Sequence, residues 1–518
     1  MGRIVIDPVT RIEGHLKIEA MVEGGVVKEA RSTGTLFRGF EIILQGRDPR
    51  DAQRITQRIC GVCPTSHSTA AALNLDSAFG IADKIPENGR LLRNLILGAA
   101  HIADHILHFY HLAALDYVDV AALAKYRGKD PALKSVRDFI ARGESAPFVS
   151  RGRSDFRLSR KASETLAAHY LKAFEMRRKG QEAAAIFGGK LPHNVGIVPG
   201  GVTAVPTVDK IASFLWRLNE LREFIDNVYL PDVFEVARAY PDYFEIGAGC
   251  KRTLSYGVYE LETAEADLVK RKRLFLNGIV FEDLKREPLD ISRISEEVKS
   301  SWYAEECKGK PAAGKTIPAP HKKDGYSWIK SPRSDGRVCE VGPLARVLAT
   351  YAGGDPRMRE LVDGALKEAG VSAKALFSTL GRHLARALGA KFIADSMPAW
   401  LLELKPGEPA YIDSKVPEES EGMGLVEAAR GALGHWIRIK DGKIALYQCV
   451  VPTTWNASPR DDRGQPGPLE QALTGVRLKD ESSPVEIGRI VRSFDPCLAC
   501  AVHLLSPKGT EIGRVEIC

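Results

Sequence analysis

The sequence predicts an α+β protein that is mostly helical, with a core of long bundled helices, a small N-terminal sheet and peripheral α/β parts. Three observations favour this fold class: long stretches with apolar residues every three or four positions, short alternating runs, and two CxxC pairs near opposite ends. The 518 residues, 44% of them hydrophobic, suffice to bury a large core. We expect one metal site to join the N- and C-terminal CxxC pairs.

The first element is a sheet of small strands within residues 3–35, where alternating runs are broken by Gly24-Gly25 and Gly34. Long helices are expected to follow this sheet. Apolar spacings of three and four predict them over residues 51–79, 88–124, 159–187 and 208–239. Four helices of this length are typical of a bundle core.

The second half of the chain is expected to be mixed. Residues 245–345 are rich in Gly, Pro and Lys and alternate in short runs, which indicates a smaller α/β part. Helical periodicity returns over residues 343–402. Farther along, Asp441-Gly442 separates two alternating apolar runs, which predicts a β-hairpin that leads directly into Pro452.

Composition and charge exclude several classes of protein. A net charge of +7 from 73 basic and 66 acidic residues is small, and the basic positions are scattered, which argues against nucleic acid binding. The N-terminal segment lacks the basic start, apolar stretch and cleavage site of a signal peptide. The most apolar region, residues 91–123, is interrupted by charged and histidine side chains, so we expect a core helix rather than a membrane span.

Four of the nine cysteines form the two CxxC pairs, Cys60 with Cys63 and Cys497 with Cys500. A single CxxC fits a redox pair, a zinc site or an iron–sulfur site equally well. Pairs at opposite ends of a large chain indicate a catalytic metal more than a structural one, although structural zinc stays an alternative. Thiolates favour zinc, copper(I), nickel and iron, and four buried thiolates need the positive charge that a binuclear centre would supply.

Three motifs carry a family resemblance: RIEGHLKIE, RICGVCPTSH and DPCLACAVH together resemble the signatures of nickel–iron hydrogenase large subunits. Three further stretches agree with the family in the same order: ADHILHFYHLAALDYVDV, YSWIKSPRSDGRVCEVGPLAR and RGALGHWIRIKDGKIALYQCVVPTTWN. The resemblance therefore runs from Asp7 to His503. It implies an oxidoreductase subunit of the uptake, membrane-associated type that cleaves or forms H2 heterolytically. The alternative from another class is a structural zinc-binding or assembly protein without hydrogen turnover.

Two related readings share the fold that the resemblance implies. A hydrogen-sensing large subunit would keep the metal ligands but generally lacks a cleaved C-terminal peptide. A quinone-binding subunit of the complex I type has lost the paired cysteines, which are intact here. Both readings are therefore weaker than a hydrogenase.

The resemblance also implies the metal ligands. All four paired cysteines would hold nickel, and Cys63 and Cys500 would bridge to an iron that carries carbon monoxide and cyanide. A second site for magnesium, or iron, would be formed by Glu41, His503 and the backbone carbonyl of Cys449. Oxygen and nitrogen donors suit such an ion.

The reaction residues are likewise carried over from the family. Cys497 would be the first proton acceptor, with Arg430 as its competitor, and Glu13 would relay the proton outward. Arg430 would lie over the open face of the metals with Asp104 and Asp495 as carboxylate partners. From the residues alone, Arg430 reads equally well as a surface arginine before a strand, and Glu13 as an exposed strand glutamate.

Several pocket residues complete the implied site. His67 would hydrogen-bond a bridging sulfur, although a core histidine is the alternative, and such contacts tune ligand basicity. Thr453 would donate a hydrogen bond to a cyanide, and the backbone of Val451 and Pro452 would line the same pocket.

One helix of the predicted bundle carries a row of histidines on one face. Their spacings of four, three and three could serve a metal, but we expect a buried or interfacial polar stripe beside Asp104 instead. The row consists of His101, His105, His108 and His111.

The chain holds no further cysteine cluster to carry electrons away, because the other five cysteines are isolated. We therefore expect an iron–sulfur small subunit as partner and, through it, a membrane cytochrome or quinone-linked subunit. The resemblance places the protein at the periplasmic face of the cytoplasmic membrane, peripheral and exported with the small subunit; a cytoplasmic location is the alternative.

The C-terminal end suggests processing. After His503 the sequence LLSPKGTEIGRVEIC resembles a peptide that a maturation endopeptidase removes once nickel is inserted. The expected organisation is one catalytic domain, residues 1–503, and a removable peptide, residues 504–518.

Overall fold

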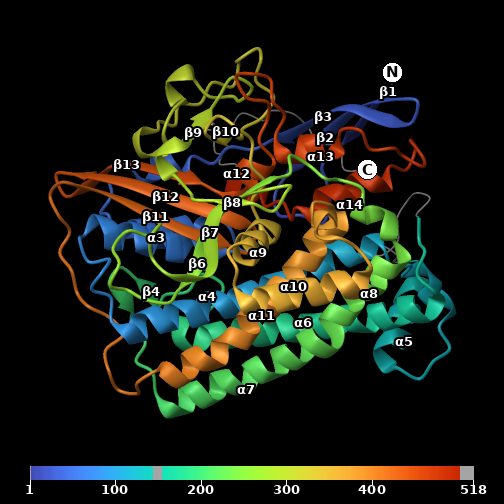
Figure 1. Ribbon diagram of the computed structural model, residues 1–518, viewed down its shortest axis with the longest axis horizontal. Helices are drawn as coiled ribbons and strands as arrows, with labels where there is room; N and C mark the ends of the chain where they lie inside the picture. Colours follow the sequence, from blue (N-terminus) through green and yellow to red (C-terminus); the bar gives the residue numbers. More distant parts are fainter. Residues whose placement is uncertain (1, 144–154, 502–518) are drawn as a thin grey trace.

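The computed structural model describes residues 2–143 and 155–501. Its core is a bundle of long helices that pack on one another, with α4 and α6 at the centre (Figure 1). Serine side chains cap two of them, since Ser159 accepts from the backbone N–H of Ala162 and Ser378 from that of Gly381. The bundle consists of α4 (Glu87–Leu107), α6 (Arg160–Gly188), α7 (Val208–Phe224), α8 (Leu230–Ala239) and α11 (Thr379–Glu403).

The predicted helix over residues 159–187 is confirmed as α6, but the other three are interrupted. The stretch 51–79 divides into α2 (Asp51–Thr56) and α3 (Pro64–Ala78), because Pro64 has no N–H to continue a helix and begins a new one. Between them lies the first CxxC pair. Helix α4 passes into a π-helical turn at His108–Ala113, and a second π-helical turn, Ile225–Tyr229, separates α7 from α8.

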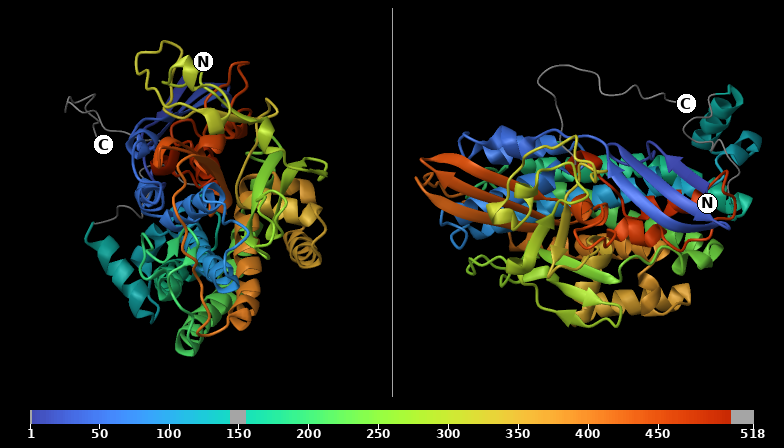
Figure 2. Two further views of the ribbon diagram at one scale, coloured as in Figure 1. Left: turned by 90° about the vertical axis from the view of Figure 1, so that its left-hand side faces the viewer. Right: turned by 90° about the horizontal axis from the view of Figure 1, so that it is seen from above.

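The predicted N-terminal sheet is present as three antiparallel strands in the order β1-β2-β3. Its turn is Gly24-Gly25, with φ of 57° and 74°, a conformation that favours glycine. Strand β3 packs against α13 (Pro468–Leu473), so the first and last parts of the chain lie side by side (Figure 2). The strands are β1 (Gly2–Ile6), β2 (Leu16–Glu23) and β3 (Val26–Gly34).

The predicted hairpin is confirmed within a second antiparallel sheet, β11 (Ser420–Ala428), β12 (Gly431–Lys440) and β13 (Lys443–Val450). Asp441 and Gly442, with φ of 53° and 64°, form the turn between β12 and β13. This sheet covers α3 closely, because a Cβ on Gly424 would lie 2.0 Å from the carbonyl oxygen of Ala70.

The middle of the chain forms the smaller α/β part. Strands β6 (Arg252–Glu260) and β7 (Arg273–Phe281), with the short β8 (Arg286–Glu287), pack against α9 (Pro343–Ala352). The remaining strands pair as β9 (Ile294–Glu297) with β10 (Ser331–Ser334) and β4 (Ile197–Val198) with β5 (Gly201–Val202). The remaining helices are α1 (Phe40–Leu44), α5 (Pro131–Ala141), α10 (Pro356–Ala369), α12 (Pro452–Asn456), α14 (Val485–Ser493) and α15 (Leu498–Ala501).

These parts share one continuous apolar core, to which strands, bundle helices and C-terminal helices all contribute. The expected α+β fold class is therefore confirmed. Across the two described ranges, no helix combines the length and the apolar character needed to cross a bilayer. Residues 91–123 are buried for the most part, as expected of a core segment.

Candidate metal centre

The two CxxC pairs meet in the interior. Cys60 and Cys63 lie in the loop before α3, and Cys497 and Cys500 lie at α15, yet the Sγ atoms of all four lie within 4.8 Å of one another. The Cys60–Cys497 and Cys63–Cys500 sulfur distances are 3.4 and 3.3 Å, and Cys497 lies 2.9 Å from Cys500. All four are free, buried thiols. The prediction that one site joins the two ends is confirmed.

Backbone contacts hold the C-terminal pair against the N-terminal segment. Glu13 and Cys497 form a parallel β-bridge, in which Glu13 N–H donates to the Pro496 carbonyl at 3.4 Å and Leu498 N–H donates to the Glu13 carbonyl at 2.6 Å. The residue after Glu13 must be a glycine. Gly14 has φ of 81°, and a Cβ on it would lie 2.5 Å from the backbone nitrogen of Ala499.

Arg38 is a positioning residue that the sequence reasoning missed. Its guanidinium donates to the carbonyl of Ile59, next to the first cysteine pair, and to that of Ala499, within the second. One side chain thus fastens both ends of the site. Its position three residues before Glu41 is the one signal in the sequence that could have drawn attention to it.

The electrostatics of the cysteines show that the protein alone does not hold four thiolates. Burial raises the pKa of Cys497 and of Cys500, and contact with Cys497 raises the pKa of Cys63. Contacts from the same sulfurs lower the pKa of Cys60. Four soft donors that need added positive charge fit a thiophilic metal centre.

Arg430 provides a fixed cation beside the sulfurs. It is 3% exposed and lies at the turn between β11 and β12, with its Nε 3.1 Å from Asp495 Oδ1 and its Nη1 3.9 Å from Asp104 Oδ2. Nη1 has no hydrogen-bond partner among the described residues. Although burial opposes it, Asp495, Cys497 and Asp104 raise the pKa of Arg430, and burial raises the pKa of Asp104 to about 7. The predicted Arg430–Asp104–Asp495 group is thus assembled.

Two further predicted residues reach the same cysteines. The side chain of Glu13 is partly buried, and burial followed by the charge of Cys60 raises its pKa. Thr453 Oγ1 accepts a hydrogen bond from Cys497 N–H at 2.9 Å, which leaves its own hydroxyl proton to donate elsewhere. Val451 and Pro452 are buried at the start of α12, beside this threonine.

His67 lies on the first turn of α3, one turn after Cys63. It is buried, and its Nδ1 lies 3.2 Å from Nε2 of His435. Burial lowers its pKa to about 4, with Cys60 opposing the shift, so the imidazole is neutral near pH 7. The sequence reasoning did not identify His435, whose contact joins residues 368 positions apart.

Glu41 and Cys449 are also brought together. Glu41 Oε1 accepts from Cys449 N–H at 2.9 Å, and Oε2 contacts the hydroxyl of Thr316, whose importance the sequence reasoning missed. The buried ammonium of Lys330 pairs with Glu296 at 3.1 Å, and the charge of Glu41 also acts on it. The third expected ligand, His503, and the peptide 504–518 lie outside the described residues.

The histidine row is a buried polar stripe, as expected. Nε2 of His105 lies 2.7 Å from Arg346, Nδ1 of His101 lies 2.7 Å from the hydroxyl of Tyr259, and Nε2 of His108 lies 2.6 Å from the Arg492 carbonyl. Within the described ranges, the four cysteines are the one set of three or more Cys, His, Asp or Glu residues that could hold a metal.

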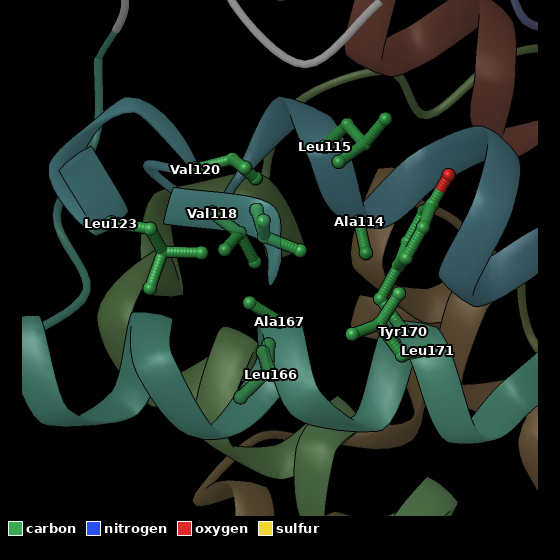
Figure 3. Close-up of a pocket in the computed structure, with 10 residues that line it drawn as sticks. Ala114, Leu115, Val118, Val120, Leu123, Leu166, Ala167, Tyr170 and Leu171 are labelled. Atoms are coloured by element: carbon green, nitrogen blue, oxygen red, sulfur yellow. The ribbon is translucent and has the colours of Figure 1, made fainter. Parts of the chain in front are cut away.

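An apolar cavity lies away from these ligands, between the segment that follows α4 and helix α6. Figure 3 shows Val118 and Ala167 pointing toward one another across it. Its lining carries no thiol, imidazole or carboxylate, so it cannot be the metal site. The lining residues are Ala114, Leu115, Val118, Val120, Leu123, Val136, Leu166, Ala167, Tyr170 and Leu171.

Comparison with known proteins gives consistent matches along the whole chain. Residues 38–503 match the family model described as nickel-dependent hydrogenase, and residues 3–33 match one described as HoxL-like. The periplasmic NiFeSe hydrogenase large subunit of Desulfomicrobium baculatum is 42% identical, covering 99% of this chain and 97% of the relative. The quinone-reactive Ni/Fe-hydrogenase large chain of Wolinella succinogenes is 36% identical, covering 99% and 98%.

A solved structure agrees with the fold as well. The Ni-Fe-Se hydrogenase from D. vulgaris Hildenborough, in its as-isolated oxidized state, superposes with a TM-score of 0.86 at 44% identity, covering 97% of this chain and 100% of that one. Matches of this extent establish both the family and the subunit. The chain therefore belongs to the nickel-dependent hydrogenases, as one of their large subunits.

Proposed function

We propose that the chain holds its nickel–iron centre through Cys60, Cys63, Cys497 and Cys500 and cleaves or forms H2 heterolytically there. The observation that carries this proposal is the convergence of four buried, free thiols from opposite ends of the sequence within 4.8 Å. By the family's pattern, all four cysteines would hold nickel, and Cys63 and Cys500 would also hold the iron. When bound, the metals supply the acceptor for the electron pair of the H–H bond.

The proton then needs a base within the chain. Cys497 is the proposed first acceptor, because its sulfur lies in the cluster and its backbone is joined to Glu13 by the β-bridge. Glu13 receives the proton next. Its raised pKa brings it closer to the range of a group that both takes and releases a proton near neutrality. Arg430, held by Asp495 and Asp104, preorganises positive charge beside the reacting hydrogen. Because its neighbours raise its pKa, it keeps its own proton, which favours Cys497 over Arg430 as the proton acceptor.

The iron's diatomic ligands are a finer part of the proposal. Carbon monoxide and cyanide are assigned by family resemblance, with Thr453 as hydrogen-bond donor to a cyanide. The hydroxyl proton of Thr453 is free for this role because its oxygen already accepts from Cys497 N–H. Val451 and Pro452, buried beside it, would line the same pocket, and His67 would donate to a bridging sulfur.

A magnesium or iron ion is proposed at Glu41, the carbonyl of Cys449 and His503. Support comes from the buried carboxylate of Glu41, which lies in contact with the backbone of Cys449. Carboxylate and carbonyl oxygens are donors that a hard cation prefers.

The partner of the chain is a small subunit, because its relatives are named as large subunits. We further propose that this subunit carries iron–sulfur clusters and passes electrons to a membrane cytochrome or a quinone-linked subunit, as the quinone-reactive relative suggests by its name. A peripheral position at the periplasmic face of the membrane, with export alongside the small subunit, is consistent with the periplasmic relative. Removal of residues 504–518 after His503 by a maturation endopeptidase completes the proposal.

The metal assignment is tested by anomalous X-ray diffraction on crystals of the mature heterodimer, measured on both sides of the nickel, iron and zinc edges. Adjacent nickel and iron peaks at the four sulfurs are expected. A single zinc peak there would instead favour the structural-metal alternative and would contradict the proposal.

A further inference from the structure

Three buried side chains form a hydrogen-bonded row that begins beside the metal centre. Nδ1 of His67 lies 3.2 Å from Nε2 of His435, and Nδ1 of His435 lies 2.9 Å from the hydroxyl of Tyr447. All three residues are at most 1% exposed. No part of the proton path described above uses His435 or Tyr447.

Tight packing of the hairpin on α3 fixes this row in place. His435 on β12 is directly opposite Cys449 on β13, and Tyr447 lies two residues before Cys449, so both rings project from the same face of the sheet. That sheet can approach α3 closely because Gly422 and Gly424 on β11 have no side chains. A Cβ on either glycine would lie within 2.3 Å of a carbonyl oxygen of α3.

His67 connects the row to the cysteines. Cys63 immediately precedes α3, and His67 lies in the first turn of α3, four residues after Cys63. This spacing places the two side chains on one face of the helix. The charge of Cys60 also acts on the imidazole of His67. The imidazole edge that does not face His435 is therefore the edge available to the sulfurs.

Hydrogen-bond chemistry limits the row to two arrangements, because a neutral imidazole has one N–H and one lone pair. In the first, Tyr447 donates to His435, His435 donates to Nδ1 of His67, and His67 carries its proton on Nε2. In the second, every bond is reversed and His67 would turn an Nε2 lone pair toward anionic sulfurs. The second arrangement is repulsive, so the first is favoured.

We propose that Tyr447 and His435 are positioning residues that fix the tautomer and ring orientation of His67, so that His67 presents Nε2–H to a bridging cysteine sulfur. This inference deepens the proposed function and rests on it. A hydrogen bond to a thiolate withdraws electron density from the sulfur and hence from the metals it bridges. The row thereby sets the electron density of the centre from outside its ligands.

The test uses infrared spectra of the purified heterodimer, in which carbon monoxide and cyanide on iron report electron density directly. Tyr447→Phe removes the donor at the start of the row, so the bands are expected to move to lower wavenumber. Tyr256→Phe is the matched control, since Tyr256 is equally buried and its hydroxyl has no hydrogen-bond partner among the described residues. Its bands are expected to match the wild type.

A pair of variants at His435 keeps the proposal testable if Tyr447→Phe fails to assemble. His435→Gln places an N–H where Nε2 lies and is expected to keep the wild-type bands. His435→Asn places its amide near Nδ1 and cannot reach His67, so its bands are expected to shift as in Tyr447→Phe. Identical wild-type bands in Tyr447→Phe and His435→Asn would overturn the row alone, whereas a wild type without diatomic bands would overturn the proposed function and the row with it.

Discussion

Glu13 and Cys497 lie side by side in one parallel β-bridge, which joins the first and last segments of the described chain at the metal centre. The bridge is closed by a 2.6 Å hydrogen bond from Leu498 N–H to the Glu13 carbonyl. A proposed proton acceptor and its relay therefore come from opposite ends of the sequence and are held by backbone rather than by side chains. We therefore expect that the relay and the bridge can be disabled separately.

Glu13→Gln disables the relay alone. The amide keeps the shape of the side chain but cannot take up a proton, so nickel and iron content are expected to match the wild type while hydrogen–deuterium exchange is lost. Exchange is measured by mass spectrometry of the headspace gas over the heterodimer in deuterated water. Glu23→Gln, at an exposed position of β2, is the control. Normal exchange in Glu13→Gln would refute the relay.

Gly14→Ala disturbs the bridge itself. The added Cβ would lie 2.5 Å from the backbone nitrogen of Ala499, so the second cysteine pair must move and nickel per chain is expected to fall sharply. Gly24→Ala is a matched control, because Gly24 also has a left-handed φ, 57°, but no atom within 4 Å of its Cβ position. Both variants carry about 1–2 kcal/mol of backbone strain. Equal nickel retention in the two would show that the close approach at Gly14 is unimportant.

Arg430→Lys separates charge from geometry at the metal centre. Lysine keeps the cation, but it cannot place planar guanidinium nitrogens between Asp495 and Asp104. Metal content is expected to persist while kcat for hydrogen-dependent dye reduction falls roughly 100-fold, the scale for losing one preorganised electrostatic group. Arg333→Lys, at an equally buried arginine paired with Asp461, should lower thermal stability but not turnover per nickel. Equal turnover losses in both would indicate a general packing effect.

Glu470 gives the fold a pH dependence that is independent of the metals. Burial raises its pKa from 4.5 to about 7, although Ser32 N–H and the Tyr326 hydroxyl donate to it. The unfolded chain loses this proton near pH 4.5 while the folded chain keeps it until about pH 7, so the group's contribution to stability is lost as pH rises through that window. The loss is on the order of 3 kcal/mol.

Glu470→Gln is therefore expected to flatten the pH dependence of the free energy of unfolding between pH 4.5 and 7. Denaturant titrations at several pH values measure this slope. Glu419→Gln, at an exposed position, should leave the slope unchanged. The prediction is wrong if the Glu470 variant keeps the wild-type slope.

The sequence predicted those features that local pattern determines. Turn chemistry identified Asp441-Gly442, and the spacing of Cys60 from Cys63 identified a metal ligand pair, because each signal lies within a few residues. The break before Pro64 was missed because apolar periodicity continues on both sides of it. A helix that stops for seven residues, about two helical turns, and then restarts keeps much the same spacing pattern.

Contacts across the fold were inaccessible to pattern alone. Residues alone could not distinguish a buried Arg430 from a surface arginine, and its partners Asp104 and Asp495 came only from family resemblance. Arg38 and His435 were missed for the same physical reason, since each acts on residues brought near by tertiary packing. Their sequence neighbours carry no sign of that packing.

The most direct test of the account measures metal content and hydrogen-dependent dye reduction together on the chain purified with its native partner, beside Cys497→Ser. We expect one nickel and one iron at the cysteines with turnover in the wild type, and loss of nickel and turnover in Cys497→Ser, because serine is a poor ligand for soft metals. Zinc alone without turnover in the mature wild-type protein would contradict the assignment and leave the structural-metal alternative in its place.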